Sequence, residues 1–567
     1  MTTPSELLTS GTFFQLFQLL RLEPDTKALV DALIRDGDAD SAAAAFDQEV
    51  VAAVQPHLAA LTAALNDPAL SAERRLVEVA LFARRLALLL KAFASDRFIL
   101  PASPDEGVVT GSASMDEHIE RMWRQLERTP QRIAHEAQRG TLIAPPEAYI
   151  APGGRFWELF YWDSFFTAVG LAASGRAAMV AHIAHNFVHL IETLGYIPNG
   201  ARTYFLGRSQ TPYTVFMFDL LRAAAPQLWG DVVLRRRYVA ALEKEYRFWM
   251  DQDGTHTGRA VSVGGVMLNR HWSNVATPRP EGYNEDISAA FAKGLDDIDP
   301  ETSAEAAQLY RDLRAACESG WDFSTRWLVR DFAGGYSLHS IRTTQILPID
   351  LNCQLYSYER RLADTTGKLA YRDAAERRKA AILANFWDED LGWFTDRLIP
   401  ADGRTGDLEP TGVLSIAGVY PLFCELLTWK DDAHLIERLA RTLETRFLFP
   451  GGVVTTLIRR ADGEGFGEQW DYPNGWAPHQ WAAVAGLAQY GYSDLAAKIA
   501  IRFVDLARQV YDRTGKMMEK YNVADLSRLA GGGEYKSQEG FGWTNGVVVA
   551  CQRYLREGKT FWLPAGA

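Results

Sequence analysis

Apolar residues recur at helical spacing along most of this chain, and this periodicity constrains its fold more than any other feature. A clear example is the row formed by Leu495, Ile499, Phe503, Leu506 and Val510, which falls on one side of a helix because its members are three or four residues apart. Residues 373–387 and 436–447 show the same amphipathic pattern. Strand signals are few and short, the clearest being residues 453–458. The sequence therefore predicts an all-α protein.

Two further segments predict individual helices. One helix is expected to begin at Thr302, whose spacing to Glu305 fits a capping box, and to stop at Gly320. The other covers residues 82–94, which read FARRLALLLKAFA and are strongly apolar. A helix that is apolar on most sides is normally enclosed by neighbours. We therefore expect residues 82–94 to be largely buried.

Long loops rich in Gly, Pro, Asn and aromatic residues separate the helices. They cover residues 195–213, 264–285, 331–352, 449–479 and 513–546. Loops of this length in a compact protein are usually functional. We therefore expect a toroid of paired helices whose loops gather at one end over a central cleft. Residues 1–110 are helical and carry no site-like segment, so they are expected to form an extension packed on the catalytic part, residues 111–567, as one structural unit.

Charge and composition exclude several classes of partner. The net charge is −12 at pH 7, and no run of Lys or Arg stands out, which argues against nucleic acid. No apolar run reaches membrane-spanning length, so no membrane partner is expected. The four cysteines lie far apart without a Cys-x-x-Cys pair, so neither a disulfide framework nor a zinc site is indicated. No signal peptide is visible, which predicts a cytoplasmic protein, or a periplasmic one if such a segment has been removed.

Two segments more than three hundred residues apart combine aromatic residues with carboxylates, Arg or Gln, Gly and Pro. Residues 152–163 read PGGRFWELFYWD, and residues 469–478 read QWDYPNGWAP. Aromatic faces stack on the apolar faces of sugar rings, while carboxylates and guanidinium groups bind sugar hydroxyls in paired hydrogen bonds. The composition of these two segments is therefore typical of a carbohydrate site.

The same mixture of residues recurs in or beside the long loops. The further clusters lie at residues 197–202, 208–212, 277–281, 318–327, 519–522, 531–535 and 540–546. Each has a simpler interpretation when taken alone, because a loop Arg is commonly a surface residue, a loop Asp a helix cap, and a Trp part of the core. Their joint occurrence favours a single site.

Hydrolysis of a glycosidic bond needs two carboxyl groups, one to protonate the leaving oxygen and one to activate water or attack the anomeric carbon. Asp322 lies just past a helix stop between two aromatic residues, surroundings that raise a carboxyl pKa by desolvation and favour it as the acid. His185 and His189 have metal-ligand spacing but lie among apolar residues, so no metal site is expected. From chemistry alone, any of six carboxylates could be the acid or the base of such a reaction: Asp163, Glu281, Asp322, Asp471, Glu519 and Glu534.

Several segments match a known family in order along the chain. They are PGGRFWELFYWDSF at 152–165, IPNG at 197–200, RSQTP at 208–212, TPRPE at 277–281, ESGWDFSTRW at 318–327, QWDYPNGWAP at 469–478, EKY at 519–521 and GGGEY at 531–535. From about residue 115 to residue 550, the chain resembles the trehalase family of glycoside hydrolases. The resemblance implies an (α/α)6 barrel that hydrolyses α,α-trehalose with inversion and needs no cofactor.

The resemblance also implies roles for individual residues. Asp322 resembles the family's general acid, and Glu519 resembles its general base. The essential arginines of the family are matched by Arg155, Arg208 and Arg279. Its other substrate-binding residues are matched by Phe156, Trp162, Asp163, Asn199, Gln210, Glu281, Gly320, Trp470 and Glu534.

Two other functions remain open at the level of sequence. One is a helical-barrel glycosidase acting on another α-glucoside, and the other is a non-catalytic sugar-binding homologue. Both presumed catalytic carboxylates, Asp322 and Glu519, are present, which disfavours the non-catalytic homologue. We expect a monomer whose partner is a small disaccharide, trehalose.

Overall fold

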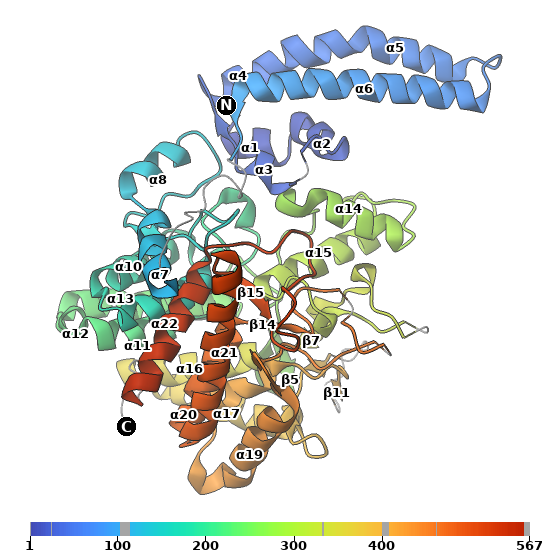
Figure 1. Cartoon of the computed structure of the whole chain (residues 1–567). Coiled ribbons are helices and arrows are strands. Elements are labelled where there is room, and N and C mark those ends of the chain that lie inside the picture. Colours follow the sequence, from blue (N-terminus) through green and yellow to red (C-terminus); the bar gives the residue numbers. More distant parts are fainter. Residues whose placement is uncertain are drawn as a thin grey trace.

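The computed structural model of the chain describes residues 2–23, 25–101, 114–331, 334–399, 408–460, 462–465, 467–558 and 560. Across these ranges the chain is mostly helical, and its strands are short (Figure 1). The predicted all-α class is confirmed.

A closed ring of helices forms the centre of the molecule. Each helix of the ring packs on the next, and the last packs back on the first. Nearly all residues of the helix at 161–173 are buried, because it is apolar on every side and has neighbours all round. The ring consists of α9 (Tyr161–Ala173), α11 (Thr214–Ala224), α16 (Ile349–Thr366), α18 (Tyr420–Phe423), α20 (Ala477–Gln489) and α22 (Gly542–Glu557).

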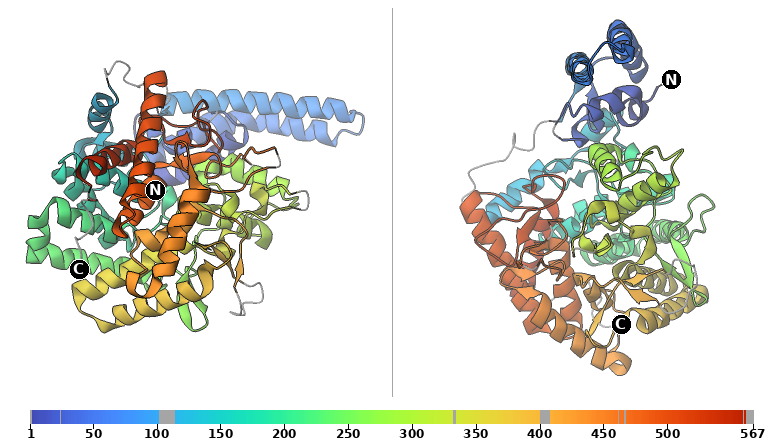
Figure 2. Two further views of the ribbon diagram at one scale, coloured as in Figure 1. Left: turned by 60° about the horizontal axis from the view of Figure 1, so that its bottom comes forward. Right: turned by 90° about the vertical axis from the view of Figure 1, so that its right-hand side faces the viewer.

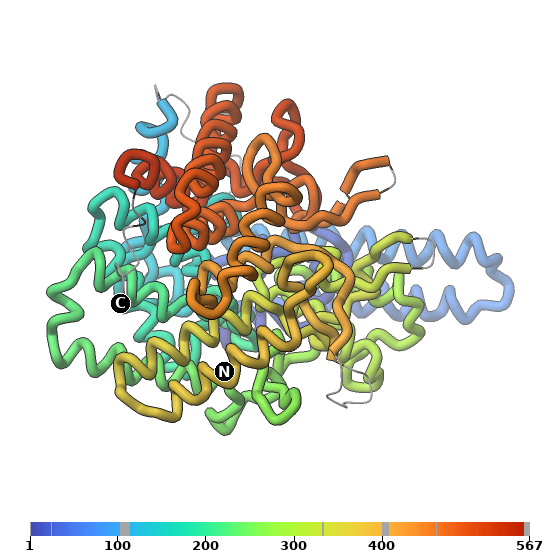
Figure 3. The backbone as a smooth tube through the Cα atoms, turned by 90° about the horizontal axis from the view of Figure 1, so that it is seen from below, coloured from blue at the N-terminus to red at the C-terminus, as the bar shows by residue number. Residues whose placement is uncertain are grey.

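Further helices cover this ring from outside. α10 packs on α9 and α11, α17 on α16, and α21 on α20 and α22. The predicted apolar face of α21 is buried, including Leu495, Ile499 and Phe503. Two layers of paired helices form the expected (α/α)6 barrel, seen from below in Figure 3. The outer helices are α7 (Met115–Gln125), α10 (Ala177–Leu194), α13 (Val232–Trp249), α17 (Leu369–Phe386), α19 (Trp429–Thr442) and α21 (Ser493–Thr514).

The remaining helices lie in the connections between the barrel helices. They are α8 (Pro130–Ala137), α12 (Pro226–Gly230), α14 (Tyr283–Ala292) and α15 (Ala304–Ser319). The predicted helix from Thr302 to Gly320 corresponds to α15. Its N-cap is Ser303 rather than Thr302, because the Ser303 hydroxyl accepts a hydrogen bond from the Ala306 backbone N–H. The predicted stop is confirmed, since Gly320 is the left-handed C-cap.

The strands form small antiparallel pairs, with one three-stranded sheet in the order β11-β10-β7. The predicted strand at 453–458 is confirmed only in part. Gly452–Val453 pairs with Leu448–Phe449, and further along Thr456 makes an isolated antiparallel bridge to Ser415. The strands are β1 (Leu33–Ile34), β2 (Phe98–Ile99), β3 (Glu127–Arg128), β4 (Tyr149–Ile150), β5 (Ala260–Val263), β6 (Val266–Asn269), β7 (Ile346–Leu347), β8 (Trp387–Asp388), β9 (Trp393–Phe394), β10 (Arg397–Leu398), β11 (Glu409–Pro410), β12 (Leu448–Phe449), β13 (Gly452–Val453), β14 (Asn474–Trp476) and β15 (Lys520–Asn522).

The N-terminal region lies at one end of the barrel (Figures 1 and 2). It shares an apolar cluster with the barrel loops, because Phe160, Tyr204 and Phe205 pack among its own buried residues. The expected boundary between an extension and a catalytic part, at residues 110 and 111, lies outside the described residues. The helices of this region are α1 (Pro4–Thr9), α2 (Thr12–Leu19), α3 (Lys27–Val30), α4 (Ala39–Phe46), α5 (Ala52–Asn66) and α6 (Ala72–Arg97).

Helices α5 and α6 form a long hairpin that extends away from the barrel (Figures 1 and 2). The prediction that residues 82–94 are largely buried is wrong. Leu86, Leu90 and Phe93 are buried, but Leu88 is 63% exposed. Along the hairpin α6 packs mainly on α5, so one side of an apolar helix faces solvent.

Candidate active site

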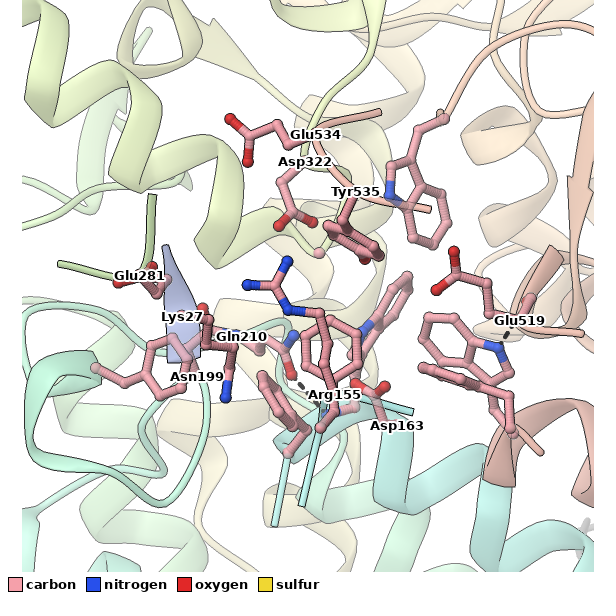
Figure 4. Close-up of a pocket in the computed structure, with 18 of the residues that line it drawn as sticks. Lys27, Arg155, Asp163, Asn199, Gln210, Glu281, Asp322, Glu519, Glu534 and Tyr535 are labelled. Atoms are coloured by element: carbon pink, nitrogen blue, oxygen red, sulfur yellow. Dashed lines mark hydrogen bonds between the residues drawn. The ribbon is translucent and has the colours of Figure 1, made fainter. Parts of the chain in front are cut away.

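A pocket lies over the N-terminal ends of α9 and α22 (Figure 4). Aromatic side chains and a few charged groups line it together, as is common in small-molecule sites. Every residue to which the family resemblance gives a role lines this pocket: Arg155, Phe156, Trp162, Asp163, Asn199, Arg208, Gln210, Arg279, Glu281, Gly320, Asp322, Trp470, Glu519 and Glu534.

The pocket wall comes mainly from the predicted long loops. Loops 195–213, 264–285, 449–479 and 513–546 all contribute residues to it. Loop 331–352 contributes none of the lining residues in the described part of the chain. It instead forms β7 and the start of α16. The expected gathering of loops over a central cleft is therefore present, with one loop used elsewhere.

Asp322 is placed by the end of α15. The left-handed Gly320 stops this helix, and the buried Trp321 follows before Asp322 turns to the pocket. Loss of solvation raises the pKa of the Asp322 carboxyl to about 7; the nearby Arg279 opposes this shift, and the charge of Glu534 adds to it. Asp322 can therefore hold a proton near neutral pH, as a general acid must.

Gly320 also fits closely against a neighbouring ring. Its φ is +77°, and a Cβ built on it would lie 2.7 Å from the Trp162 ring. Both the backbone conformation and the contact therefore require glycine at this position.

We expect Gly320→Ala to destabilise the protein more than Gly367→Ala does. Gly367 is the left-handed C-cap of α16, with φ +71° and no atom within 4 Å of a built Cβ. The control substitution carries only the backbone cost, about 1–2 kcal/mol. At Gly320 the alanine must also displace Trp162 from the pocket wall. Thermal unfolding of the two variants measures the difference, and equal melting temperatures would contradict this account of the contact.

Glu519 is placed by β15 and by the start of α22. β14 and β15 pair Trp476 with Lys520, and the Trp543 indole N–H donates to the Glu519 backbone carbonyl at 2.9 Å. Lys520 Nζ lies 3.1 Å from Glu519 Oε1, whereas Glu519 Oε2 is buried without a hydrogen-bond partner among the described residues. Burial raises the pKa of Glu519, opposed by the charge of Lys520.

Gln469 connects the segments that carry the two carboxylates. Its side-chain amide donates to the Asp322 backbone carbonyl, and its side-chain oxygen accepts from Lys520 Nζ at 2.7 Å. Asp322 and Glu519 reach the pocket from different sides of its wall (Figure 4). One polar bridge therefore fixes the chain segments on both sides of the space between them.

Arg208 and Glu281 form a buried pair with unused hydrogen-bonding capacity. Arg208 Nη2 donates to Glu281 Oε1 at 2.5 Å, and its Nε donates to Asn199 Oδ1 at 2.8 Å. Arg208 Nη1 and Glu281 Oε2 are buried without partners in the described structure. Buried polar groups are normally satisfied. A donor and an acceptor left free side by side match a sugar hydroxyl, which both accepts and donates.

Arg279 is held by carboxylates on two sides. Its guanidinium donates to Asp286 Oδ1 at 2.7 Å and to Glu534 Oε1 at 2.9 Å. Asp286 is fully buried in α14, while Glu534 stands on the pocket wall. This pairing fixes Glu534 and directs the guanidinium along the wall.

Stacked indoles form one side of the pocket. Trp470 lies parallel to Trp476 with ring centroids 3.7 Å apart, and Trp162 lies 5.5 Å from Trp470. Trp543 meets Trp476 edge to face at 5.6 Å. Such rings offer flat apolar faces to a sugar.

The candidate carboxylates differ in their surroundings in the structure, and this difference narrows the choice of acid and base. Asp471 does not line the pocket and is buried, where it accepts hydrogen bonds from Ser324, Thr325 and Thr456. It therefore has a structural role. Glu281 and Glu534 are paired with arginines. Asp163 lies in the first turn of α9 on the pocket wall, and loss of solvation raises its pKa well above the usual value.

Several residues of the pocket wall are not among those predicted from the sequence. The aromatic residues among them lie inside or beside the predicted clusters, so their position was a usable signal. Lys27 is different, because residues 1–110 were expected to carry no site-like segment. The additional lining residues are Lys27, Phe160, Phe205, Trp476, Tyr535, Phe541 and Trp543.

Comparison with known proteins places this site in a family. The family model described as trehalase matches residues 100–555. The chain belongs to the trehalase family. A putative periplasmic trehalase of Salmonella typhi is 39% identical over 476 residues, which cover 81% of this chain and 77% of that protein. A periplasmic trehalase of Salmonella paratyphi B is 39% identical over 473 residues, with the same coverage.

A solved structure gives the same assignment for the fold. The neutral trehalase Nth1 from Saccharomyces cerevisiae superposes with a TM-score of 0.58 at 25% identity, covering 72% of this chain and 74% of that chain. The family expected from the sequence motifs is therefore confirmed, and so is the helical barrel.

Proposed function

We propose that this chain hydrolyses α,α-trehalose to two glucose molecules with inversion, using Asp322 as general acid and Glu519 as general base. The observation that carries the proposal is the placement of these two carboxyl groups on one pocket, each with a raised pKa, in a member of the trehalase family. Glycosidic hydrolysis requires one carboxyl group that donates a proton to the leaving oxygen and one that takes a proton from water.

The reaction follows from the two environments. Asp322 protonates the oxygen that links the two glucose units, and the bond from that oxygen to the anomeric carbon breaks. Glu519 takes a proton from a water molecule as the water oxygen bonds to the same carbon from the opposite face. Glu519 Oε2 has no protein partner in the described structure, so it is free to hold that water.

The other wall residues are suited to hold the two sugar rings. The indole faces of Trp470 and Trp162 provide flat apolar surfaces. Arg208 and Glu281 offer a free donor and a free acceptor, and Arg279 extends the polar wall beside Glu534. Binding through fixed groups of this kind positions the scissile bond between the acid and the base.

The stereochemistry of the products tests the mechanism. An inverting reaction on trehalose releases one β-glucose, while the leaving glucose keeps its α configuration. Proton NMR in the first minutes, before mutarotation, should show both anomers in equal amounts. The inverting geometry also requires the carboxyl groups to be separated by roughly 6.5–9.5 Å, with room for water. Only α-glucose at early times would contradict inversion.

The pH dependence of kcat/KM tests the assignment of the acid. Asp322 donates only while protonated, and its pKa is raised to about 7. We therefore expect kcat/KM to fall by about tenfold per unit above this pH. Ionisation of Glu519 is needed for the base, so activity should also fall in acid. Rate measurements from pH 4 to pH 9 provide the profile, and full activity at pH 9 would exclude Asp322 as the acid.

Substrate range separates this proposal from another α-glucosidase activity. Incubation with trehalose, maltose and sucrose, followed by a glucose assay, should give turnover of trehalose above the other two sugars. Preferential hydrolysis of maltose or sucrose would favour a glycosidase for a different α-glucoside.

The sequence and the named relatives indicate different cellular compartments for this activity. The sequence predicts the cytoplasm, whereas the two Salmonella relatives are named periplasmic and do not support that prediction. We propose the periplasm on the basis of these relatives. No helix in the described ranges is long and apolar enough to cross a membrane. Osmotic-shock fractionation, with trehalase activity measured in each fraction, tests the location.

A further inference from the structure

A short N-terminal segment reaches the pocket from outside the region that the family model matches. We call residues 25–31 the N-terminal strap; it contains α3, and the family match begins only at residue 100. Lys27 of the strap lines the pocket, beside residues that come much later in the chain (Figure 4). The N-terminal region is therefore in direct contact with the site.

Buried charges fix the strap to the barrel loops. Lys27 is only 3% exposed, and its Nζ pairs with Asp31 and lies 2.9 Å from Glu158 Oε1. Arg202 Nε lies 3.2 Å from both Asp31 Oδ1 and Glu158 Oε2. Two cations thus balance two anions. Removing any one member of such a buried cluster strongly destabilises the fold, because it leaves a buried charge without a partner.

The strap also contacts two of the proposed substrate-binding segments. Asp25 Oδ1 accepts a hydrogen bond from Arg155 Nη2 at 2.6 Å. The Thr26 hydroxyl donates to the backbone carbonyl of Glu281 at 2.7 Å. The strap therefore holds both Arg155 and the start of the Glu281 segment.

Arg155 depends on this contact for its orientation. Its guanidinium lies over the Tyr535 ring, 4.8 Å from the centroid, and Asp25 is its one carboxylate partner in the described structure. Ring contacts alone allow a guanidinium to slide and rotate, whereas a charge-assisted hydrogen bond fixes its direction. The Asp25 side chain is 38% exposed. It does not line the pocket itself, but it contacts Arg155, which does.

We propose that Asp25 is a positioning residue of the active site, which directs the Arg155 guanidinium toward the bound sugar. The inference rests on the proposed function of the pocket and names a part of the site that the family match does not include. It assigns the N-terminal strap to substrate binding as well as to the fold.

The test compares Asp25→Asn with Asp25→Glu and with Asp36→Asn. Asp36 is an exposed residue of the same region, so its substitution reproduces the charge change away from the pocket. We expect Asp25→Asn to raise the KM for trehalose by about tenfold, with a smaller change in kcat and an unchanged melting temperature. Asp25→Glu should recover part of the loss, and Asp36→Asn should match the parent. A fall in kcat alone, accompanied by a lower melting temperature, would overturn the proposal.

A double substitution shows whether Asp25 acts through Arg155. If it does, adding Asp25→Asn to Arg155→Ala should change KM by less than about twofold, because the group being directed is already gone. Additive effects of the two substitutions would overturn the proposal. Calorimetric titration with trehalose gives the same comparison without turnover. A parent protein that does not hydrolyse trehalose overturns the proposed function, whereas a parent that does, with Asp25→Asn equal to it, overturns this inference alone.

Discussion

Asp322→Asn should lose activity on trehalose by about 10²-fold to 10⁴-fold. An amide of the same shape cannot protonate the oxygen between the two glucose units. The loss should fall on kcat, because the substituted residue keeps its size and its place after the left-handed Gly320. Steady-state kinetics on purified protein measures it.

A substrate with a better leaving group separates acid catalysis from a general loss of function. Fluoride leaves α-glucosyl fluoride without needing a proton from Asp322. The Asp322→Asn variant should therefore keep most of its turnover of this substrate while losing turnover of trehalose. Equal losses on both substrates would show that Asp322 does not act as the acid.

The Asp322→Asn substitution should not lower stability at high pH, although it lowers activity. The pKa of Asp322 is raised from 3.8 to about 7, so the folded state holds this proton more tightly than the unfolded state. The stabilising effect of the proton is complete below the unfolded value and is lost as the pH rises through the folded value. Asparagine carries no such charge. Above pH 7, Asp322→Asn should melt at or above the temperature of the parent.

The barrel and its loops were predictable because their signals are local. Apolar residues at helical spacing mark α21, and a glycine stop marks the end of α15 just before Asp322. The composition of the aromatic and carboxylate segments indicated a carbohydrate site, and the structure brings these segments together around one pocket. Sequence chemistry could not separate Asp471 from Glu519, since only the fold shows that Asp471 is surrounded by donors.

What the sequence could not predict depends on contacts between distant segments. Lys27 has no aromatic neighbours in the chain, and its partners Glu158 and Asp31 become its partners only through folding. The exposure of Leu88 was missed for a related reason. An apolar helix predicts burial, but whether a neighbour covers each side is set by the overall arrangement. Periodicity shows that a helix forms, and tertiary packing decides what encloses it.

Glu519→Gln should also lose activity by about 10²-fold to 10⁴-fold, because water would no longer be deprotonated on the face opposite the leaving glucose. Two features support Glu519 over Glu534 as the base. Glu519 Oε2 is buried without a hydrogen-bond partner in the described structure, whereas both oxygens of Glu534 accept from Arg279, at 2.9 and 3.3 Å. The carboxylate with a free oxygen is the one able to hold a water molecule.

Azide distinguishes a missing base from a damaged site. It attacks the anomeric carbon without losing a proton, so it should restore bond cleavage in Glu519→Gln and give β-glucosyl azide. Glu534→Gln is the matched control, with the same chemical change on the same wall. It should weaken binding through Arg279 and show no rescue by azide. An active Glu519→Gln beside a Glu534→Gln that is inactive and rescued by azide would place the base in the 531–535 segment instead. In that case the attacking water would lie on the side of the pocket that holds Arg279. The unpaired oxygen of Glu519 would then need another explanation.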